Sequence, residues 1–84
     1  MDNKTRKKWL KERDEAAQSF NVPKFKAFYR KWAKKGVYEL HDLPSDEVIE
    51  ITMRKMVCCI ADPKPDKLEE ARDWLTERGY SWTI

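Results

Sequence analysis

The chain has 84 residues, 39% of them charged and 40% hydrophobic, with a formal net charge of +3. This length predicts one domain, residues 1–84, and no apolar run approaches the roughly 20 residues of a membrane-spanning helix. The two cysteines are adjacent, which predicts free thiols in a reducing compartment. The basic N-terminus lacks the apolar stretch of a secretory signal, so we expect a cytoplasmic protein.

The charge is distributed unevenly along the chain. Residues 1–35 contain twelve Lys and Arg against four Asp and Glu, whereas residues 36–84 contain six against eleven. This asymmetry has two interpretations: a polyanionic partner for the basic part, or attraction between the two parts of the chain.

Glycine, proline and hydrophobic spacing predict four helices, at about 4–19, 23–35, 45–61 and 66–78. Gly36 and Gly79 directly follow helical patterns, as helix C-caps do, and the prolines fall between or at the start of patterns. The expected fold class is all-α: a small four-helix bundle with a central apolar third helix, a short extended connector and a docked C-terminal tail.

The first expected helix combines an apolar side with a lysine stripe, and Asp2 or Asn3 is its expected N-cap. Its apolar side gathers Trp9, Leu10, Ala16, Ala17 and Phe20. Its opposite side carries Lys4, Lys7, Lys8 and Lys11. Lysines in the first turns oppose the helix dipole, so they serve either solubility or an anionic partner.

The expected helix at 23–35 is the clearest amphipathic segment. One face is an aromatic stripe, expected to be core, of Phe25, Phe28, Tyr29 and Trp32. The opposite face is basic and consists of Lys24, Lys26, Arg30, Lys31, Lys34 and Lys35, with the small Ala27 at its centre. The preceding junction also resembles a helix-turn-helix, but that unit would bury Ala27 and Arg30, in conflict with the aromatic stripe.

The segment Val37–Leu43 reads as an extended connector, and we interpret His41, beside Asp42, as a loop residue. In the helix expected at 45–61, capped by Ser45, the apolar face contains Val48, Ile49, Thr52, Met53, Met56, Val57, Cys59 and Ile60. Glu47, Glu50 and Arg54 form a narrow wet stripe, flanked by Ile51 and Cys58. This register predicts a buried Cys59 and a more exposed, more reactive Cys58.

The last expected helix buries Leu68, Ala71 and Leu75, with Trp74 on the flank, and its outer face carries Glu69, Glu70, Asp73 and Glu77. Tyr80 is placed to contact Leu75 in a Schellman-type C-cap. The tail Tyr80–Ile84 alternates apolar and polar residues, so we expect it to pack over the helices and to pair briefly with Val37–Leu40.

The sequence argues against an enzyme, because it shows no glycine-rich phosphate loop, no histidine dyad and no metal-ligand spacing. No cofactor, metal or membrane is expected. One binding hypothesis is a DNA- or RNA-binding accessory or regulatory factor that uses the basic residues of the first two helices. The alternative is a protein–protein interaction module, or homodimer, with Ile51 and Cys58 or the Tyr80–Ile84 tail as its contact patch.

Overall fold

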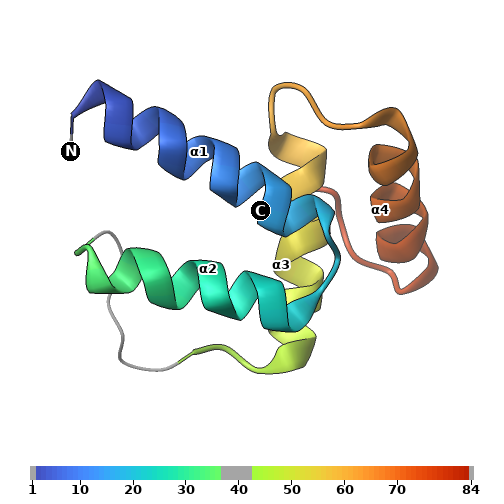
Figure 1. Cartoon of the computed structure of the whole chain (residues 1–84). Coiled ribbons are helices and arrows are strands. Elements are labelled where there is room, and N and C mark those ends of the chain that lie inside the picture. The colour runs from blue at the N-terminus through green and yellow to red at the C-terminus, as the bar shows by residue number, and fades with distance from the viewer. Residues whose placement is uncertain (1, 37–42, 84) are drawn as a thin grey trace.

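The computed structural model describes residues 2–36 and 43–83, and that part of the chain contains four helices and no strand (Figure 1). They are α1 (Asn3–Gln18), α2 (Val22–Lys34), α3 (Asp46–Cys59) and α4 (Pro65–Glu77). The all-α prediction is confirmed, and each helix begins and ends within one or two residues of its expected position.

Side-chain caps explain where three of the helices begin. The Asp2 carboxylate accepts a hydrogen bond from the Thr5 amide at 2.7 Å, and the Ser45 hydroxyl accepts one from the Val48 amide at 3.3 Å. Both agree with the caps expected from the sequence. Asn21, in the turn before α2, caps that helix by accepting from the Lys24 amide at 3.0 Å. Each bond satisfies a backbone N–H that has no partner inside its helix.

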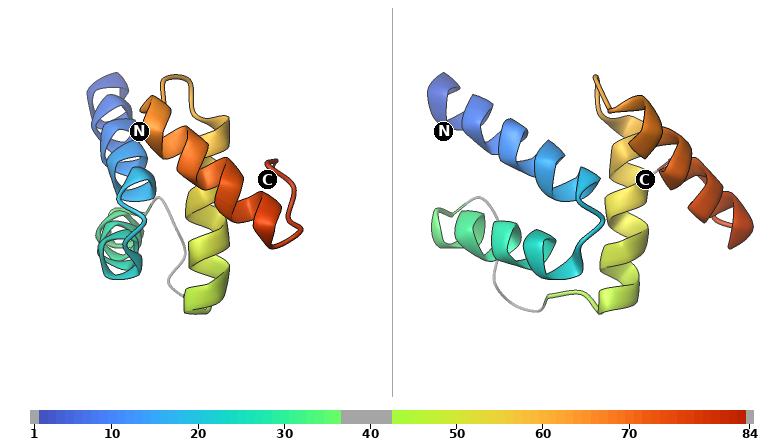
Figure 2. Two further views of the ribbon diagram at one scale, coloured as in Figure 1. Left: turned by 90° about the vertical axis from the view of Figure 1, so that its right-hand side faces the viewer. Right: turned by 45° about the vertical axis from the view of Figure 1, so that its right-hand side comes forward.

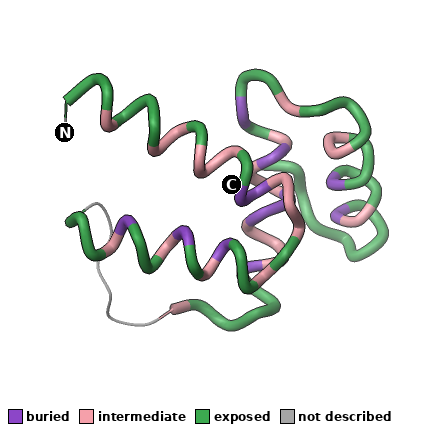
Figure 3. The backbone as a smooth tube through the Cα atoms, viewed as in Figure 1, coloured by how far each residue is buried: buried purple, intermediate pink, exposed green. Residues whose placement is uncertain are grey.

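Helix α3 is the central element, as the sequence predicts. It crosses the end of α1 and the start of α2 on one side and packs against α4 on the other (Figures 1 and 2). Figure 3 shows buried positions along α3 and on the inner sides of α2 and α4. The largest fully buried side chains are Trp32, Ile49, Met53, Val57 and Leu75. Residues from all of α2, α3 and α4 therefore contribute to the core.

Because of the position of α4, several residues of α3 differ in burial from the sequence prediction. Arg54 was expected in the wet stripe but is only 7% exposed, and Val48 was expected in the core but is 47% exposed. Cys58 is half-buried and Cys59 is exposed, so the predicted order of the cysteines is wrong. The physical reason is that α4 covers the side of α3 that carries Arg54 and Cys58: Arg54 lies over the Trp74 ring, and Cys58 packs against the cluster of Ala17, Val57 and Ala71.

The C-terminal tail contacts the helices, as predicted, although residues 80–83 all remain exposed. The Tyr80 amide donates to the Leu75 carbonyl at 2.9 Å and its ring stacks on Trp74, with centroids 6.4 Å apart. The Trp82 indole then donates to the Thr76 hydroxyl at 3.2 Å. The backbone bond is the six-residue closure of a Schellman motif, which the left-handed Gly79 (φ +76°) makes accessible.

Three expectations concern residues 37–42, which lie outside the described residues. They are the extended connector up to residue 42, the loop position of His41 beside Asp42, and the pairing of the tail with residues 37–40. Ile84, expected on the same face as Tyr80 and Trp82, also lies outside them.

Candidate nucleic-acid interface

Helices α1 and α2 form a hairpin whose inner side is aromatic. They run back alongside each other after a short turn (Figures 1 and 2). Phe25, Phe28 and Trp32 are buried on α2, so the prediction of a core aromatic stripe is confirmed for these three residues, whereas Tyr29 is only half-buried. Ala27 and Arg30 are exposed, which excludes the helix-turn-helix packing that would bury them. The aromatic stripe thus fixes the opposite face of α2 toward solvent.

Most of the predicted basic site residues are exposed. Among the residues that the structure describes, the following are exposed and form no ion pair: Lys4, Lys7, Lys8, Lys11, Lys24, Arg30, Lys34 and Lys35. Those of α1 lie on the face of the helix opposite Trp9 and Ala16, which pack in the core cluster. Their ammonium groups are therefore free to contact an anionic ligand.

Lys31 differs from these residues, because it is paired with Glu12 of α1. Its ammonium group forms an ion pair with the Glu12 carboxylate, and the indole of the neighbouring Trp32 donates to the same carboxylate at 3.0 Å. The hydrogen bond from Lys31 lowers the pKa of Glu12, against the effect of burial, and the charge of Lys8 lowers it further. Lys31 therefore links the two helices of the hairpin, and its charge is largely neutralised.

Lys26 and Lys35 are also partly engaged. The Lys26 ammonium lies 2.6 Å from the Asp46 carboxylate at the start of α3. The Lys35 ammonium lies over the Trp32 ring at 4.7 Å from its centroid, a cation–π arrangement. The structure therefore narrows the expected basic face of α2 to Lys24, Arg30 and Lys34, with Lys35 at its end.

A groove between α1 and α2 separates the two basic stripes near the turn. It has a volume of about 370 Å³ and is lined by Glu12 and Glu15 of α1 as well as Lys24 and Lys31 of α2. The groove therefore contains both negative and positive side chains. The lysines of α1 and the basic residues of α2 do not form one continuous basic surface along their whole length.

Sequence reasoning missed Glu12 and Asp46 as partners of the basic face. Each carboxylate lies on a different helix from the lysine that it pairs with, and only the packing of the helices brings them together. Periodicity correctly placed Lys26 and Lys31 on the polar side of α2, but it contains no information about the neighbouring helix.

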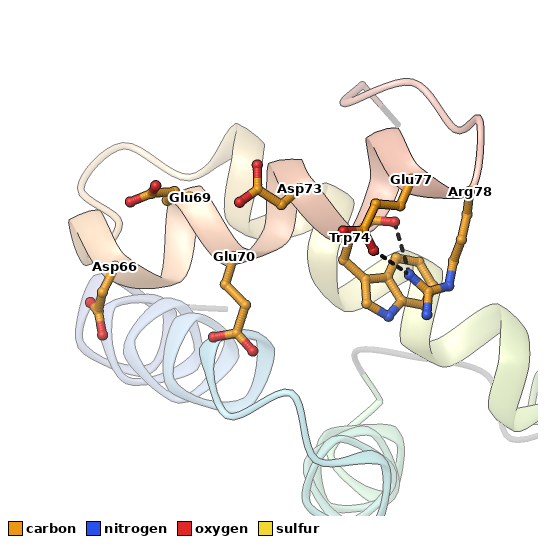
Figure 4. Close-up of a pocket in the computed structure, with 7 residues that line it drawn as sticks. All are labelled: Asp66, Glu69, Glu70, Asp73, Trp74, Glu77 and Arg78. Carbon is orange, nitrogen blue, oxygen red and sulfur yellow. Dashed lines mark hydrogen bonds and ion pairs between the residues drawn. The ribbon is translucent and has the colours of Figure 1, made fainter.

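The outer face of α4 has the opposite charge. A depression of about 430 Å³ on this face is lined by Asp66, Glu69, Glu70, Asp73 and Glu77, together with Trp74 and Arg78. Figure 4 shows these side chains. Arg78 is held in place because its guanidinium donates to the Trp74 carbonyl at 3.1 Å and lies 3.8 Å from the Glu77 carboxylate. This cluster of carboxylates repels an anionic ligand from the face.

The two patches suggested for protein contact are partly covered. Ile51 and Cys58 are half-buried beside α4. In the tail, Tyr80 and Trp82 remain 37% and 45% exposed. Arg72 lies over the Trp82 ring at 4.8 Å from its centroid, so part of that indole already contacts the protein's own surface.

Other site types find no support in the described residues. No group of three or more His, Cys, Asp or Glu in 2–36 and 43–83 is placed to hold a metal ion. None of the helices described is long and apolar enough to cross a membrane.

A comparison with known protein families, characterised proteins and solved structures finds no match for this chain.

Proposed function

We propose that this protein is a non-enzymatic nucleic-acid-binding factor that contacts phosphates through the outward faces of α1 and α2. One observation carries the proposal: two neighbouring helices expose lysine and arginine side chains without acidic partners in the described part of the chain. The buried Phe25, Phe28 and Trp32 hold α2 in the orientation that presents them.

The mode of binding follows from the kind of side chain exposed. Lysine and arginine heads neutralise phosphates irrespective of base sequence, so most of the affinity is electrostatic and falls steeply with salt. The exposed Ala27 lies between Lys24 and Arg30 and leaves room for a phosphate backbone to approach α2. We therefore expect binding to duplexes of any sequence.

The proposal is tested with the double variant Arg30→Glu and Lys34→Glu. Both side chains are exposed, so the variant keeps the fold, unlike a change at Lys31, which would also break the pair with Glu12. Labelled duplex DNA and RNA are titrated at about 50 and 200 mM salt. Abolishing one phosphate interaction lowers the log–log salt slope for duplex DNA by about 0.9. We expect strong weakening for the variant.

A matched control has the same change in net charge elsewhere. Lys55→Glu with Lys64→Glu alters α3 and the segment before α4, and we expect its affinity to stay close to that of the wild type. Equal weakening by both double variants would mean that only net charge matters. The absence of saturable binding by the wild type at the lower salt would overturn the proposal.

The second candidate, a protein-interaction module, is favoured by the exposed fractions of Tyr80 and Trp82. Aromatic side chains of this kind are enriched at protein interfaces. Apolar association of that kind persists at high salt, whereas phosphate binding does not. The substitution Trp82→Ala therefore distinguishes the two: it weakens a protein contact through the tail and leaves nucleic-acid binding unchanged.

A further inference from the structure

Two exposed helix faces of this chain carry opposite charges at the same spacing. On α1 the lysines stand at positions i, i+3, i+4 and i+7 and are Lys4, Lys7, Lys8 and Lys11. On α4 the acids stand at the same four relative positions and are Asp66, Glu69, Glu70 and Asp73. All of these residues are exposed. This spacing aligns side chains along one side of a helix, so each set forms a single stripe.

The two stripes do not meet within one molecule. The start of α1 and the outer face of α4 lie at opposite ends of a molecule that is 37 Å long (Figures 1 and 2). Figure 4 shows the carboxylates of α4 directed away from the helix axis. In the described residues, Glu70 contacts Lys67 at 3.8 Å, and no ion pair joins α4 to the lysines of α1. Both stripes are thus available to another molecule.

The helix dipoles add a second reason for the stripes to be matched. The first turn of α1 contains no acidic residue, and the last turn of α4 contains no basic residue but ends at Glu77. The lysines near the start of α1 and Glu77 at the end of α4 have the sign that the helix dipole disfavours, and the Asp2 cap and the Arg78 guanidinium offset only part of this. If the two helices lie antiparallel, the lysines near the start of α1 face the end of α4. The acids of α4 then lie beside the positive end of the α1 dipole, and the lysines of α1 lie toward the negative end of the α4 dipole.

We propose that the acidic face of α4 docks on the lysine face of α1 of a second copy of this chain. The contact is head-to-tail, because each copy supplies a different face and keeps its other face free, so the association can extend beyond two copies. Exposed ion pairs contribute little each, which makes the contact weak, dependent on concentration and sensitive to salt. This goes beyond the proposed function, and a nucleic acid would compete for the same lysines.

The test is sedimentation velocity on the full chain without nucleic acid, so its outcome is independent of the proposed function. Salt is set at about 10 mM, where the Debye length is about 30 Å, and at about 1 M, where it is about 3 Å. The average mass of the wild type should rise with concentration above that of the 10.1 kDa monomer at low salt. At high salt it should return to the monomer value.

Two charge-reversed variants identify the surfaces. Lys7→Glu with Lys11→Glu leaves two lysines and two acids on the α1 face, and Glu69→Lys with Asp73→Lys leaves two acids and two lysines on the α4 face. Each variant thus keeps only one charged face of the pair, so each alone should be monomeric. An equimolar mixture of the two should associate again, because each variant then supplies the face that the other lacks. Circular dichroism confirms that both variants remain helical.

Matched controls reverse the same number of charges elsewhere. Arg30→Glu with Lys34→Glu controls for the lysines, and Glu47→Lys with Asp62→Lys controls for the acids; both should still associate. A wild type that is monomeric at low salt at every concentration would overturn the proposal and leave the lysines of α1 to nucleic acid alone. Association that persists in both face variants, or is not restored in their mixture, would overturn it as well.

Discussion

The guanidinium of Arg54 lies 4.1 Å from the ring centroid of Trp74 and 4.8 Å from that of Phe20. Arg54 belongs to α3, Trp74 to α4 and Phe20 to the turn between α1 and α2, so one cation connects three parts of the fold. Burial lowers the pKa of Arg54. Its Nη1 donates to the Glu50 carbonyl at 3.0 Å, while its Nε has no hydrogen-bond partner in the described structure.

We expect Arg54→Lys to be more destabilising than Arg54→Met. A lysine ammonium is more strongly hydrated than a guanidinium and lacks the planar surface that stacks on two rings, so its burial is less favourable. Methionine fills similar space without a charge to desolvate. The expected loss for Arg54→Lys is about 1–3 kcal/mol, the scale of a buried, partly unsatisfied polar group. Urea unfolding followed by circular dichroism measures both. A less stable Arg54→Met would show that the cation itself stabilises the fold.

The pair of Glu12 with Lys31 predicts a dependence of stability on pH. The pKa of Glu12 is lower in the folded protein than its ordinary value of 4.5. A carboxyl group of this kind contributes stability that is fully present above the unfolded pKa and is lost as the pH falls through the lower, folded pKa. The free energy of unfolding should therefore fall between about pH 5 and the acid limit. Glu12→Gln should be less stable at neutral pH and should lose less on acidification. If the free energy of unfolding of this variant falls as much on acidification as that of the wild type, Glu12 is not the cause of the pH dependence.

Most of the fold follows from the sequence, because helix formation is local. The caps at Asp2 and Ser45 and the spacing of the α2 aromatic residues predict three helices closely. For α3, it was less predictable which sides of the helix are buried. Its sequence is apolar nearly all round, so periodicity alone does not say which side α4 covers, and the burial of Arg54 depends on that choice. The stacking of a guanidinium between two rings has no signature in the order of residues.

The candidate site was predictable to the same extent. Exposure of the lysines of α1 and of Arg30 and Lys34 follows from the periodicity of each helix. The neutralisation of Lys26 by Asp46 and of Lys31 by Glu12 does not, because it depends on contacts between helices. The residues best suited to test the proposed function are therefore the predicted basic residues that have no acidic partner, and only the structure shows which these are.

The two adjacent cysteines should react at different rates, in the order opposite to the one that the sequence predicts. Cys59 is exposed, whereas Cys58 is half-buried and its burial raises its pKa, which reduces the fraction of reactive thiolate. We expect Cys59 to react first with a thiol reagent in the native protein, as identified by mass spectrometry after brief labelling. The variants Cys58→Ser and Cys59→Ser serve as controls. Faster labelling of Cys58 would contradict the packing of α4 on that side of α3.

Phe20 stores backbone strain in the turn between α1 and α2. It is the only residue other than glycine with a positive φ in the described structure, at +49°, in the position after the helix cap where glycine is preferred. Two cations contact its ring: the Arg54 guanidinium lies 4.8 Å and the Lys67 ammonium 5.2 Å from the ring centroid. These contacts offset the strain. Removing the ring should destabilise the protein whichever smaller residue replaces it.

The comparison of Phe20→Ala with Phe20→Gly isolates the strain. Both variants lose the ring, but only glycine adopts the left-handed conformation freely, so Phe20→Gly should be the more stable by about 1–2 kcal/mol. At an ordinary helical position the order is reversed, and Ala27→Gly on the exposed face of α2 is the matched control, with an expected loss of about 1 kcal/mol. Urea unfolding of the three variants provides the measurement. If Phe20→Ala proves as stable as Phe20→Gly, the turn relaxes once the ring is gone, and the left-handed backbone is a consequence of the contacts with Arg54 and Lys67.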